Sequence, residues 1–243
     1  MVDIDNRINN EKKFHNKRYS NDERTNKYNK FYEFNTKLEE YYFKECLFYS
    51  KNKITLEIGC GTGTSLGYQV NKVTTKFNAI DISEVGVQKA REFYNNKNVN
   101  VLDIHKTTFP TSHFDFIFCT ATLHHLDIKN AFKEIMRILK PGGTFIMIEP
   151  LGINPLINFY RILTPNDRSL DEKPLDNKDL KFLINNSKKC EIHYHNILLF
   201  FLPLLRINSE NSIAALFFKI DKFFCKIPLL RKLAWYCMIK VYK

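Results

Sequence analysis

The chain lacks a hydrophobic run long enough to cross a bilayer, and its N-terminal residues lack an apolar core. The longest apolar stretch runs from Ile197 to Leu205 and contains Pro203. It has about half of the ~18–20 residues that a transmembrane helix needs. The charged N-terminal residues predict no signal peptide. We therefore expect a cytoplasmic protein that is soluble or peripheral to a membrane.

Paired cysteines are also missing. None of the six cysteines belongs to a C-x-x-C pair, which excludes the usual spacing of a zinc site and gives no disulfide framework. We expect a reducing compartment and no bound metal. The cysteines are Cys46, Cys60, Cys119, Cys190, Cys225 and Cys237.

Acidic residues are fewer than basic ones: 26 against 37, which gives a formal net charge of +11. This balance favours partners such as nucleic acid, anionic lipid or a phosphorylated substrate. A composition rich in lysine and asparagine explains the charge equally well. The 243 residues fit one α/β domain with additions. We divide it into an N-terminal helical arm or lid (1–50), a cofactor-binding core (51–150) and a substrate lid with the C-terminal part (151–243).

The stretch that organises the chain reads L-E-I-G-C-G-T-G-T and spans Leu56 to Thr64. A glycine-rich turn between a strand and a helix lets the backbone approach a ligand closely. Glu57 lies inside this motif, and Asp81 and Asp103 end the next two apolar runs. Acidic residues at successive strand ends make the glycine signal much stronger.

These residues resemble the S-adenosylmethionine-dependent methyltransferases of class I, closely over 54–149 and only in architecture after 176. The resemblance implies a Rossmann-like, doubly wound, mostly parallel seven-stranded sheet with an antiparallel C-terminal hairpin and an N-terminal helical lid. It implies S-adenosylmethionine as cofactor and S-adenosylhomocysteine as product. The residues expected at the cofactor are Glu57, Gly59, Cys60, Gly61, Thr62, Gly63, Asp81, Ile82, Asp103, Ile104 and Thr120.

Each expected contact has its own chemistry. The glycine turn would cradle the methionine portion, with Glu57 near its ammonium or holding the loop. Asp81 would accept both ribose hydroxyls, and Asp103 the adenine amine. Ile82 and Ile104 would sandwich the adenine ring. Each aspartate, taken alone, is equally explained by a strand-end turn or a helix cap.

Short apolar runs alternate with helical stretches from residue 53, which predicts parallel βαβ units. The expected strands are 54–58, 77–82, 99–102, 114–119 and 144–149, separated by helices over 64–71, 83–96 and 128–140. The alternation fails after Glu149. We then expect a helix over 176–187, a strand over 191–200, a helix over 209–226 and a final strand over 233–242.

Two histidines, His124 and His125, follow the fourth strand and resemble the pair found there in the family. Ligands of α/β sheets bind at the carboxyl ends of strands, so either histidine could deprotonate an oxygen or nitrogen nucleophile. Alternatively, one histidine caps the next helix and the other packs in the core, because methyl transfer can proceed by orientation alone.

Further residues are candidates for contact with the methyl acceptor. In the lid interpretation, the N-terminal segment brings His15, Arg18 or Tyr19 to the mouth of the site; otherwise it is a surface arm. The segment after the fifth strand offers arginines that could grip a carboxylate or phosphate, or be simply solvated. The candidates there are Glu149, Tyr160, Arg161 and Arg168.

We predict transfer of a methyl group to oxygen or nitrogen of a small or lipid-linked acceptor. The C-terminal third mixes aromatics with lysines, either as core packing or as a surface for an anionic membrane. The alternatives are an RNA methyltransferase and a non-catalytic cofactor-binding regulatory subunit. The sequence lacks the motif of exocyclic-amine DNA methylation, so nucleic acid is the less favoured partner.

Overall fold

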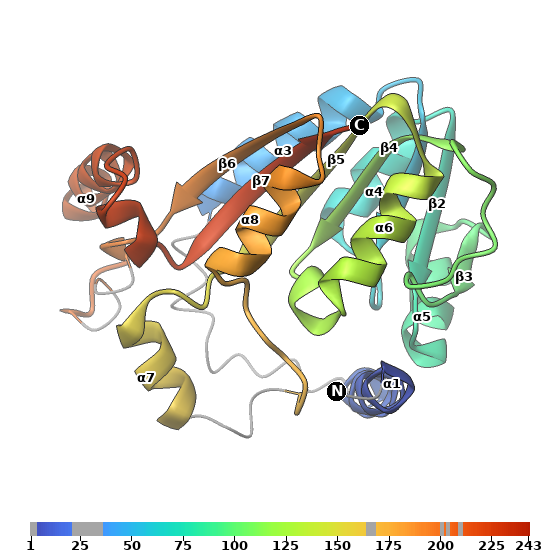
Figure 1. Cartoon of the computed structure of the whole chain (residues 1–243), viewed down its shortest axis with the longest axis horizontal. Coiled ribbons are helices and arrows are strands. Elements are labelled where there is room, and N and C mark those ends of the chain that lie inside the picture. The colour runs from blue at the N-terminus through green and yellow to red at the C-terminus, as the bar shows by residue number, and fades with distance from the viewer. Residues whose placement is uncertain (1–3, 21–35, 164–168, 200–201, 203–204, 209–210) are drawn as a thin grey trace.

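The structure is a computed structural model of the chain. It describes residues 4–20, 36–163, 169–199, 202, 205–208 and 211–243 (Figure 1). A seven-stranded sheet forms its centre, with the strand order β3-β2-β1-β4-β5-β7-β6. The strands are β1 (Ile54–Ile58), β2 (Lys76–Asp81), β3 (Val99–Val101), β4 (Phe114–Thr120), β5 (Leu139–Pro150), β6 (Lys189–His195) and β7 (Tyr236–Tyr242).

The pairing of these strands confirms the expected class I sheet. Strands β1 to β5 run parallel, while β7 pairs antiparallel with both β5 and β6. Parallel strands buried on both faces are almost wholly apolar, and β4 has this character in its run F-D-F-I-F-C-T. The carboxyl ends of β1, β2, β4 and β5 therefore lie along one edge of the sheet.

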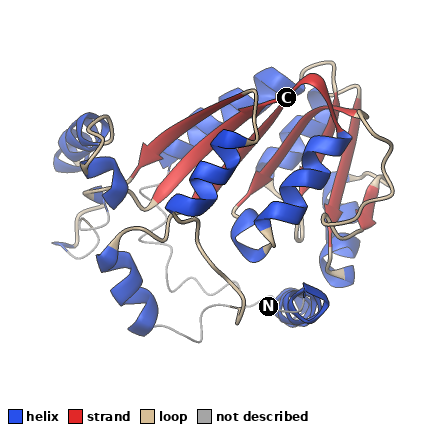
Figure 2. Cartoon of the chain, viewed as in Figure 1, coloured by secondary structure: helices blue, strands red, loops and turns tan. Residues whose placement is uncertain are grey.

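Helices cover both faces of the sheet (Figure 2). In the view of Figure 1, α6 and α8 lie in front, and α3 and α4 lie behind. The described helices are α1 (Ile4–Ser20), α3 (Thr36–Ser50), α4 (Ser65–Val73), α5 (Glu84–Tyr94), α6 (Ile128–Ile138), α7 (Pro155–Leu163), α8 (Asn177–Asn185) and α9 (Ser212–Phe224), with short 3-10 turns at Leu123–His125 and Leu230–Leu233.

Two apolar cores result, one on each face. One holds Phe132 and Ile135 of α6 with Leu183 of α8; the other holds Tyr42 and Cys46 of α3 with residues of α4 and α5. Local caps fix where the crossover helices begin. Thr64, Ser83 and Asp127 each accept a backbone N–H from the first turn of α4, α5 and α6, respectively.

The C-terminal half differs from expectation at three places. The strand expected over 191–200 ends at His195, so the prediction for its second half is wrong. The reason is Asp221 on α9, whose carboxylate accepts the backbone N–H groups of Asn196, Ile197 and Leu198 at 2.9, 2.7 and 2.6 Å. These N–H groups therefore cannot donate to a neighbouring strand, and β6 ends before them. Residue 200 lies outside the described residues.

Helix α7 was not expected, since the segment after β5 is rich in proline. It begins at Pro155, a residue that is well suited to the first position of a helix because its missing N–H is not needed there. Strand β5 begins at Leu139, five residues before the expected start, since Leu139 already pairs with Phe114 across a register shift. Among the described residues, no helix has the length and apolar character to cross a membrane.

Candidate active site

The glycine turn between β1 and α4 has the left-handed backbone that its sequence predicts. Gly59, Gly61 and Gly63 have φ angles of 71°, 52° and 100°, a region that other residues adopt only with strain. A Cβ atom at Gly59 would lie 2.3 Å from Thr122 Oγ1, so the turn also packs tightly against the segment after β4. The turn thus lies at the carboxyl edge of the sheet, packed between the segment after β4 and Tyr19.

Glu57 fixes the conformation of this turn by hydrogen bonds. Its two carboxylate oxygens accept hydrogen bonds from Thr64 Oγ1 and Tyr94 Oη, both at 2.7 Å. Burial raises the pKa of the Glu57 carboxyl to about 7, although these two hydrogen bonds act in the opposite direction. Of the two roles expected for Glu57, the geometry favours the one that fixes the loop.

Asp81 connects the second strand to the glycine turn. Its Oδ2 accepts the backbone N–H of Gly61 at 2.8 Å, and its Oδ1 accepts that of Ser83 at 2.9 Å. Burial raises the pKa of the Asp81 carboxyl against these hydrogen bonds. Each carboxylate oxygen keeps further lone pairs, so Asp81 retains the capacity to accept a diol at the edge of the turn.

A small cavity is lined in part by Ile82, the residue that follows Asp81 in the sequence. Ile82 and Asp103 line it together with Arg7, Glu11 and His125. The Asp103 carboxylate also accepts the backbone N–H of His105 at 3.0 Å. Its pKa is lowered, because this bond and the His105 ring outweigh its burial. Ile82 and Asp103 thus place an apolar group and an acceptor around one cavity of about 10 Å³, which is smaller than a purine ring.

Helix α1 covers the carboxyl edge of the sheet, where Figure 1 shows it below the strand ends. Asn16 contacts the turn after β2, accepting from Ser83 Oγ at 2.6 Å and donating to Glu84 Oε2 at 3.0 Å. Lys12 forms an ion pair with the same Glu84. Tyr19 lies against the backbone of Gly61 and Gly86, since a Cβ at Gly61 would be 2.8 Å from Tyr19 Oη. Helix α1 therefore has the position of a lid.

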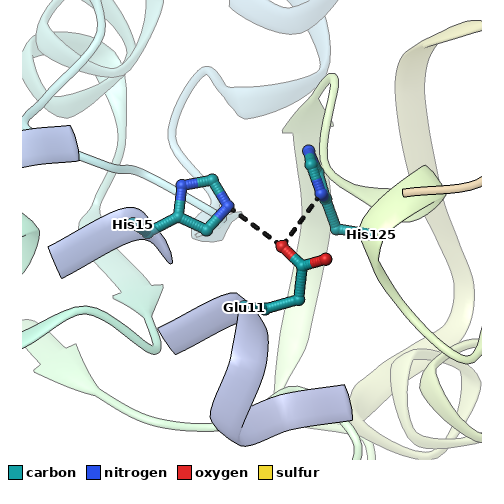
Figure 3. A group of neighbouring side chains, drawn as sticks. All are labelled: Glu11, His15 and His125. Atoms are coloured by element: carbon teal, nitrogen blue, oxygen red, sulfur yellow. Dashed lines mark ion pairs between the residues drawn. The ribbon is translucent and has the colours of Figure 1, made fainter. Parts of the chain in front are cut away.

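The lid meets the core at a cluster of Glu11, His15 and His125 (Figure 3). Glu11 Oε2 lies 3.1 Å from His125 Nδ1 and 3.4 Å from His15 Nε2. Ser169 donates to the other Glu11 oxygen at 2.5 Å. Burial would raise the pKa of Glu11, but its contacts with His125, His15 and Ser169 prevail and lower it. A buried carboxylate between two histidines thus ties α1 to the turn after β4.

The neighbouring His124 has a different environment. It is buried, and its Nδ1 lies 2.7 Å from Glu149 Oε2. Glu149 is itself buried and accepts the backbone N–H groups of Thr122 and Leu123 at 2.9 and 2.7 Å. Glu149, expected at the substrate, instead supports the turn that carries the two histidines.

The remaining candidates are dispersed. Ile104 is part of the apolar core, and Cys60 is buried. Thr120 bonds to Tyr42 Oη at 3.3 Å. Arg161 lies on α7 and Arg18 is exposed on α1. Thr62 is part of the turn, while Arg168 and the side chain of Tyr160 lie outside the described residues.

Two groups of side chains are of the type that binds metal ions. Glu11, His15 and His125 form one, and His124, His125 and Glu172 the other, each with ligand atoms within 4.8 Å of one another. The ion pairs of Glu11 account for the first group without an ion. The absence of a metal stays a prediction of the sequence.

Sequence reasoning missed Glu11, Tyr94 and Ser169. One signal was available for Glu11: it lies four residues before His15 in a helical segment, so both side chains share one face. Tyr94 and Ser169 carried no such signal, because their contacts join segments that are distant in sequence.

Comparison with known proteins agrees with this geometry. Residues 56–147 match the methyltransferase domain family. A sterol 24-C-methyltransferase of Aspergillus fumigatus is 25% identical over 117 residues, which cover 45% of this chain and 31% of that protein. The chain therefore aligns with about a third of the length of this curated relative.

Solved structures share the fold over most of the chain. A methyltransferase of Thermotoga maritima dependent on S-adenosylmethionine superposes with a TM-score of 0.60 at 16% identity, over 90% of this chain and 96% of that one. Geranyl diphosphate C-methyltransferase of Streptomyces coelicolor gives 0.57 at 14% identity, over 85% and 80%. At these identities the likeness establishes the fold.

Proposed function

Because residues 56–147 form a methyltransferase domain within a class I fold, we propose that this protein transfers a methyl group from S-adenosylmethionine to a small or lipid-linked acceptor. The acceptor atom we propose is oxygen or nitrogen. The contact between Gly61 and Asp81 supports the proposal most directly. It holds a carboxylate against the glycine turn, as recognition of a ribose beside an amino-acid moiety requires.

The residues of the site fit this cofactor. Asp81 bonds to the backbone of Gly61 beneath Tyr19 of α1, so α1 covers the position proposed for the cofactor. Ile82 and Asp103 line one small cavity beside it and would contact the purine. When bound, the cofactor supplies a methyl group on a positively charged sulfur. The chain's part is to align the acceptor with that methyl group and to exclude water, which favours the reaction by orientation.

We assign the role of general base to His125 rather than His124. The Nδ1 atom of His125 lies 3.1 Å from Glu11 Oε2 and 3.3 Å from Ser169 Oγ. A hydrogen on Nδ1 would direct the lone pair of Nε2 to accept a proton from the acceptor. Glu11 is then a positioning residue, contributed by the lid. His124 faces buried Glu149 and serves the turn. His15 and Tyr19 of α1 would border the acceptor when the lid is closed.

The names of the relatives indicate a chemical class for the acceptor. Two of the three named relatives act, by their names, on a sterol and on geranyl diphosphate, both of which carry large hydrocarbon parts. This supports an apolar small molecule or a lipid-linked acceptor. Both names also specify carbon as the methylated atom, so carbon is a second candidate beside oxygen and nitrogen.

The experiment is a transfer assay with methyl-labelled S-adenosylmethionine against lipid, small-metabolite and RNA fractions. We expect label in the lipid or metabolite fraction, and a His125→Gln variant to lose it. Label confined to RNA would support the RNA methyltransferase instead. No label in any fraction, from protein that binds the cofactor, would support a regulatory subunit.

A further inference from the structure

Helix α9 lies at the far left of Figure 1 and reaches the core beside α6 and α8 through Phe224 at its end. Only one side of the helix is buried, at Ala214 and Asp221. The opposite side carries Ile213, Leu216 and Phe223, which are 47%, 55% and 61% exposed. Three large apolar side chains on the outside of one short helix indicate a surface with a use other than the core.

Lysines lie next to these apolar residues. Lys219, Lys222 and Lys226 are all exposed. At 3.6 residues per turn, Leu216 and Phe223 share a stripe, and Lys219 and Lys226 form a second stripe beside it. The outer side of α9 is therefore divided lengthwise into an apolar half and a basic half.

The same composition continues into the segments on either side of the helix. Leu205 is 62% and Leu229 is 73% exposed, and Arg206, Arg231 and Lys232 are exposed beside them. Among the described residues 205–208 and 211–233, the single acidic residue is Asp221, which is buried. We call the exposed residues of α9 and of its two flanking segments the α9 surface: Leu205, Arg206, Ile213, Leu216, Lys219, Lys222, Phe223, Lys226, Leu229, Arg231, Lys232 and Leu233.

We propose that the α9 surface binds the face of an anionic lipid bilayer. Helices that lie in a membrane interface combine an apolar face with lysine and arginine along their polar side. The apolar residues would enter the boundary between headgroups and acyl chains, and the cations would meet lipid phosphates. The charge pattern supports this occupant, because every exposed charge described on this surface is positive.

Other occupants match the surface less well. A second copy of the chain would bring two sets of cations together without described carboxylates to pair them. A nucleic acid would neutralise the cations but leave Ile213, Leu216 and Leu229 in contact with water or phosphate. A lipid surface offers acyl chains to the apolar half of α9 and phosphates to its basic half.

The position of α9 relates this surface to the candidate active site. The segment that contains α9 leaves the sheet at His195 and re-enters it at Tyr236, and Tyr236 pairs with both His195 and Pro150, the last residue of β5. The α9 surface therefore lies toward the carboxyl edge of the parallel strands. If the proposed methyl transfer holds, a docked membrane would present lipid-linked acceptors at that edge. The membrane contact itself does not depend on the methyl transfer.

The test is flotation of the full chain with vesicles, without cofactor or acceptor. The vesicles are pure phosphatidylcholine or phosphatidylcholine with about one third phosphatidylglycerol. We expect binding to the anionic vesicles at least tenfold tighter than to the neutral ones, and weaker binding at high salt. A Lys219→Gln, Lys222→Gln double variant should lose roughly fivefold in affinity per lysine. A Leu216→Ser, Phe223→Ser variant should lose binding at low salt as well as at high salt.

The matched control is Phe48→Ser, since Phe48 is 75% exposed on α3 and outside the α9 surface. It should bind vesicles as the unaltered protein does, and all variants should keep the same melting temperature. The proposal is overturned if the unaltered protein does not float, if neutral vesicles bind equally, or if Phe48→Ser abolishes binding as the α9 variants do. A dimer in light scattering that the α9 variants dissociate would also overturn it, in favour of self-association.

Discussion

Glu11 Oε2 on helix α1 lies 3.1 Å from Nδ1 of His125, which follows β4 more than a hundred residues later. This contact joins α1, which we propose as a lid, to the proposed base, so the two are positioned together. Arg7 of α1 strengthens the join by donating to the backbone carbonyl of His125 at 3.1 Å.

Replacing Glu11 by Gln should lower kcat/KM for methyl transfer by about 10- to 100-fold. An amide cannot hold the His125 ring as a carboxylate does, and a misoriented base gives up part of the roughly 10²–10⁴-fold contribution of general base catalysis. The pH profile of kcat/KM should also shift. The control is Glu84→Gln, because Glu84 contacts Lys12 and Asn16 of the same helix but not His125. If Glu84→Gln shifts the pH profile equally, Glu11 acts only by anchoring α1.

The two histidines should separate into one catalytic and one structural residue. His125→Gln should lower kcat by roughly 10²–10⁴-fold. His124→Gln should instead lower the free energy of unfolding by about 1–3 kcal/mol, because Glu149 is buried and would lose a partner. Steady-state kinetics and urea unfolding of both variants measure this. Equal kinetic losses in both, with equal stability, would contradict the assignment.

The Glu57 carboxyl should make the cofactor-free protein less stable as pH rises. Burial raises its folded pKa to about 7 from the ordinary value of 4.5, so the folded state binds an extra proton between these values. The free energy of unfolding should then fall by up to about 1.4 kcal/mol per pH unit as pH rises from 4.5 to 7. In Glu57→Gln this contribution should vanish. Urea unfolding at several pH values tests it, and identical slopes in the two proteins would refute it.

Two glycine substitutions separate backbone strain from loss of the cofactor site. Gly61→Ala and Gly142→Ala both place a side chain at positive φ, at 52° and 77°, and each should cost about 1–2 kcal/mol. A Cβ at Gly142 has no neighbour within 4 Å, whereas one at Gly61 lies 2.8 Å from Tyr19 Oη. Only Gly61→Ala should weaken the binding of S-adenosylhomocysteine, by tenfold or more in calorimetry. Equal affinities for both variants would show that the turn does not hold the cofactor.

Local patterns predicted the parts of the molecule that are built locally. The glycine turn and the acidic residue ending β2 were both found from neighbouring residues in the sequence. These features depend on backbone geometry over a few residues, so their signals are short and strong.

The parts that escaped prediction depend on contacts between distant segments. Asp221 ends β6 through backbone groups some 25 residues away, which no periodicity reports. Ser169 meets Glu11 across 158 residues. The apolar run from Ile197 to Leu199 suits a strand as well as it suits a loop. It does not form a strand because the Asp221 carboxylate accepts backbone N–H groups of this run.

The central claim is that the glycine turn and Asp81 bind S-adenosylmethionine. The most direct measurement is thermal unfolding of the purified protein with and without S-adenosylhomocysteine, with NADH as the control ligand. At about 100 times the dissociation constant, binding adds about 2.7 kcal/mol, which raises the melting temperature by roughly 5–10 °C for a chain of this size. We expect that rise with S-adenosylhomocysteine alone. No rise in folded protein free of copurified cofactor, or an equal rise with NADH, would contradict the claim.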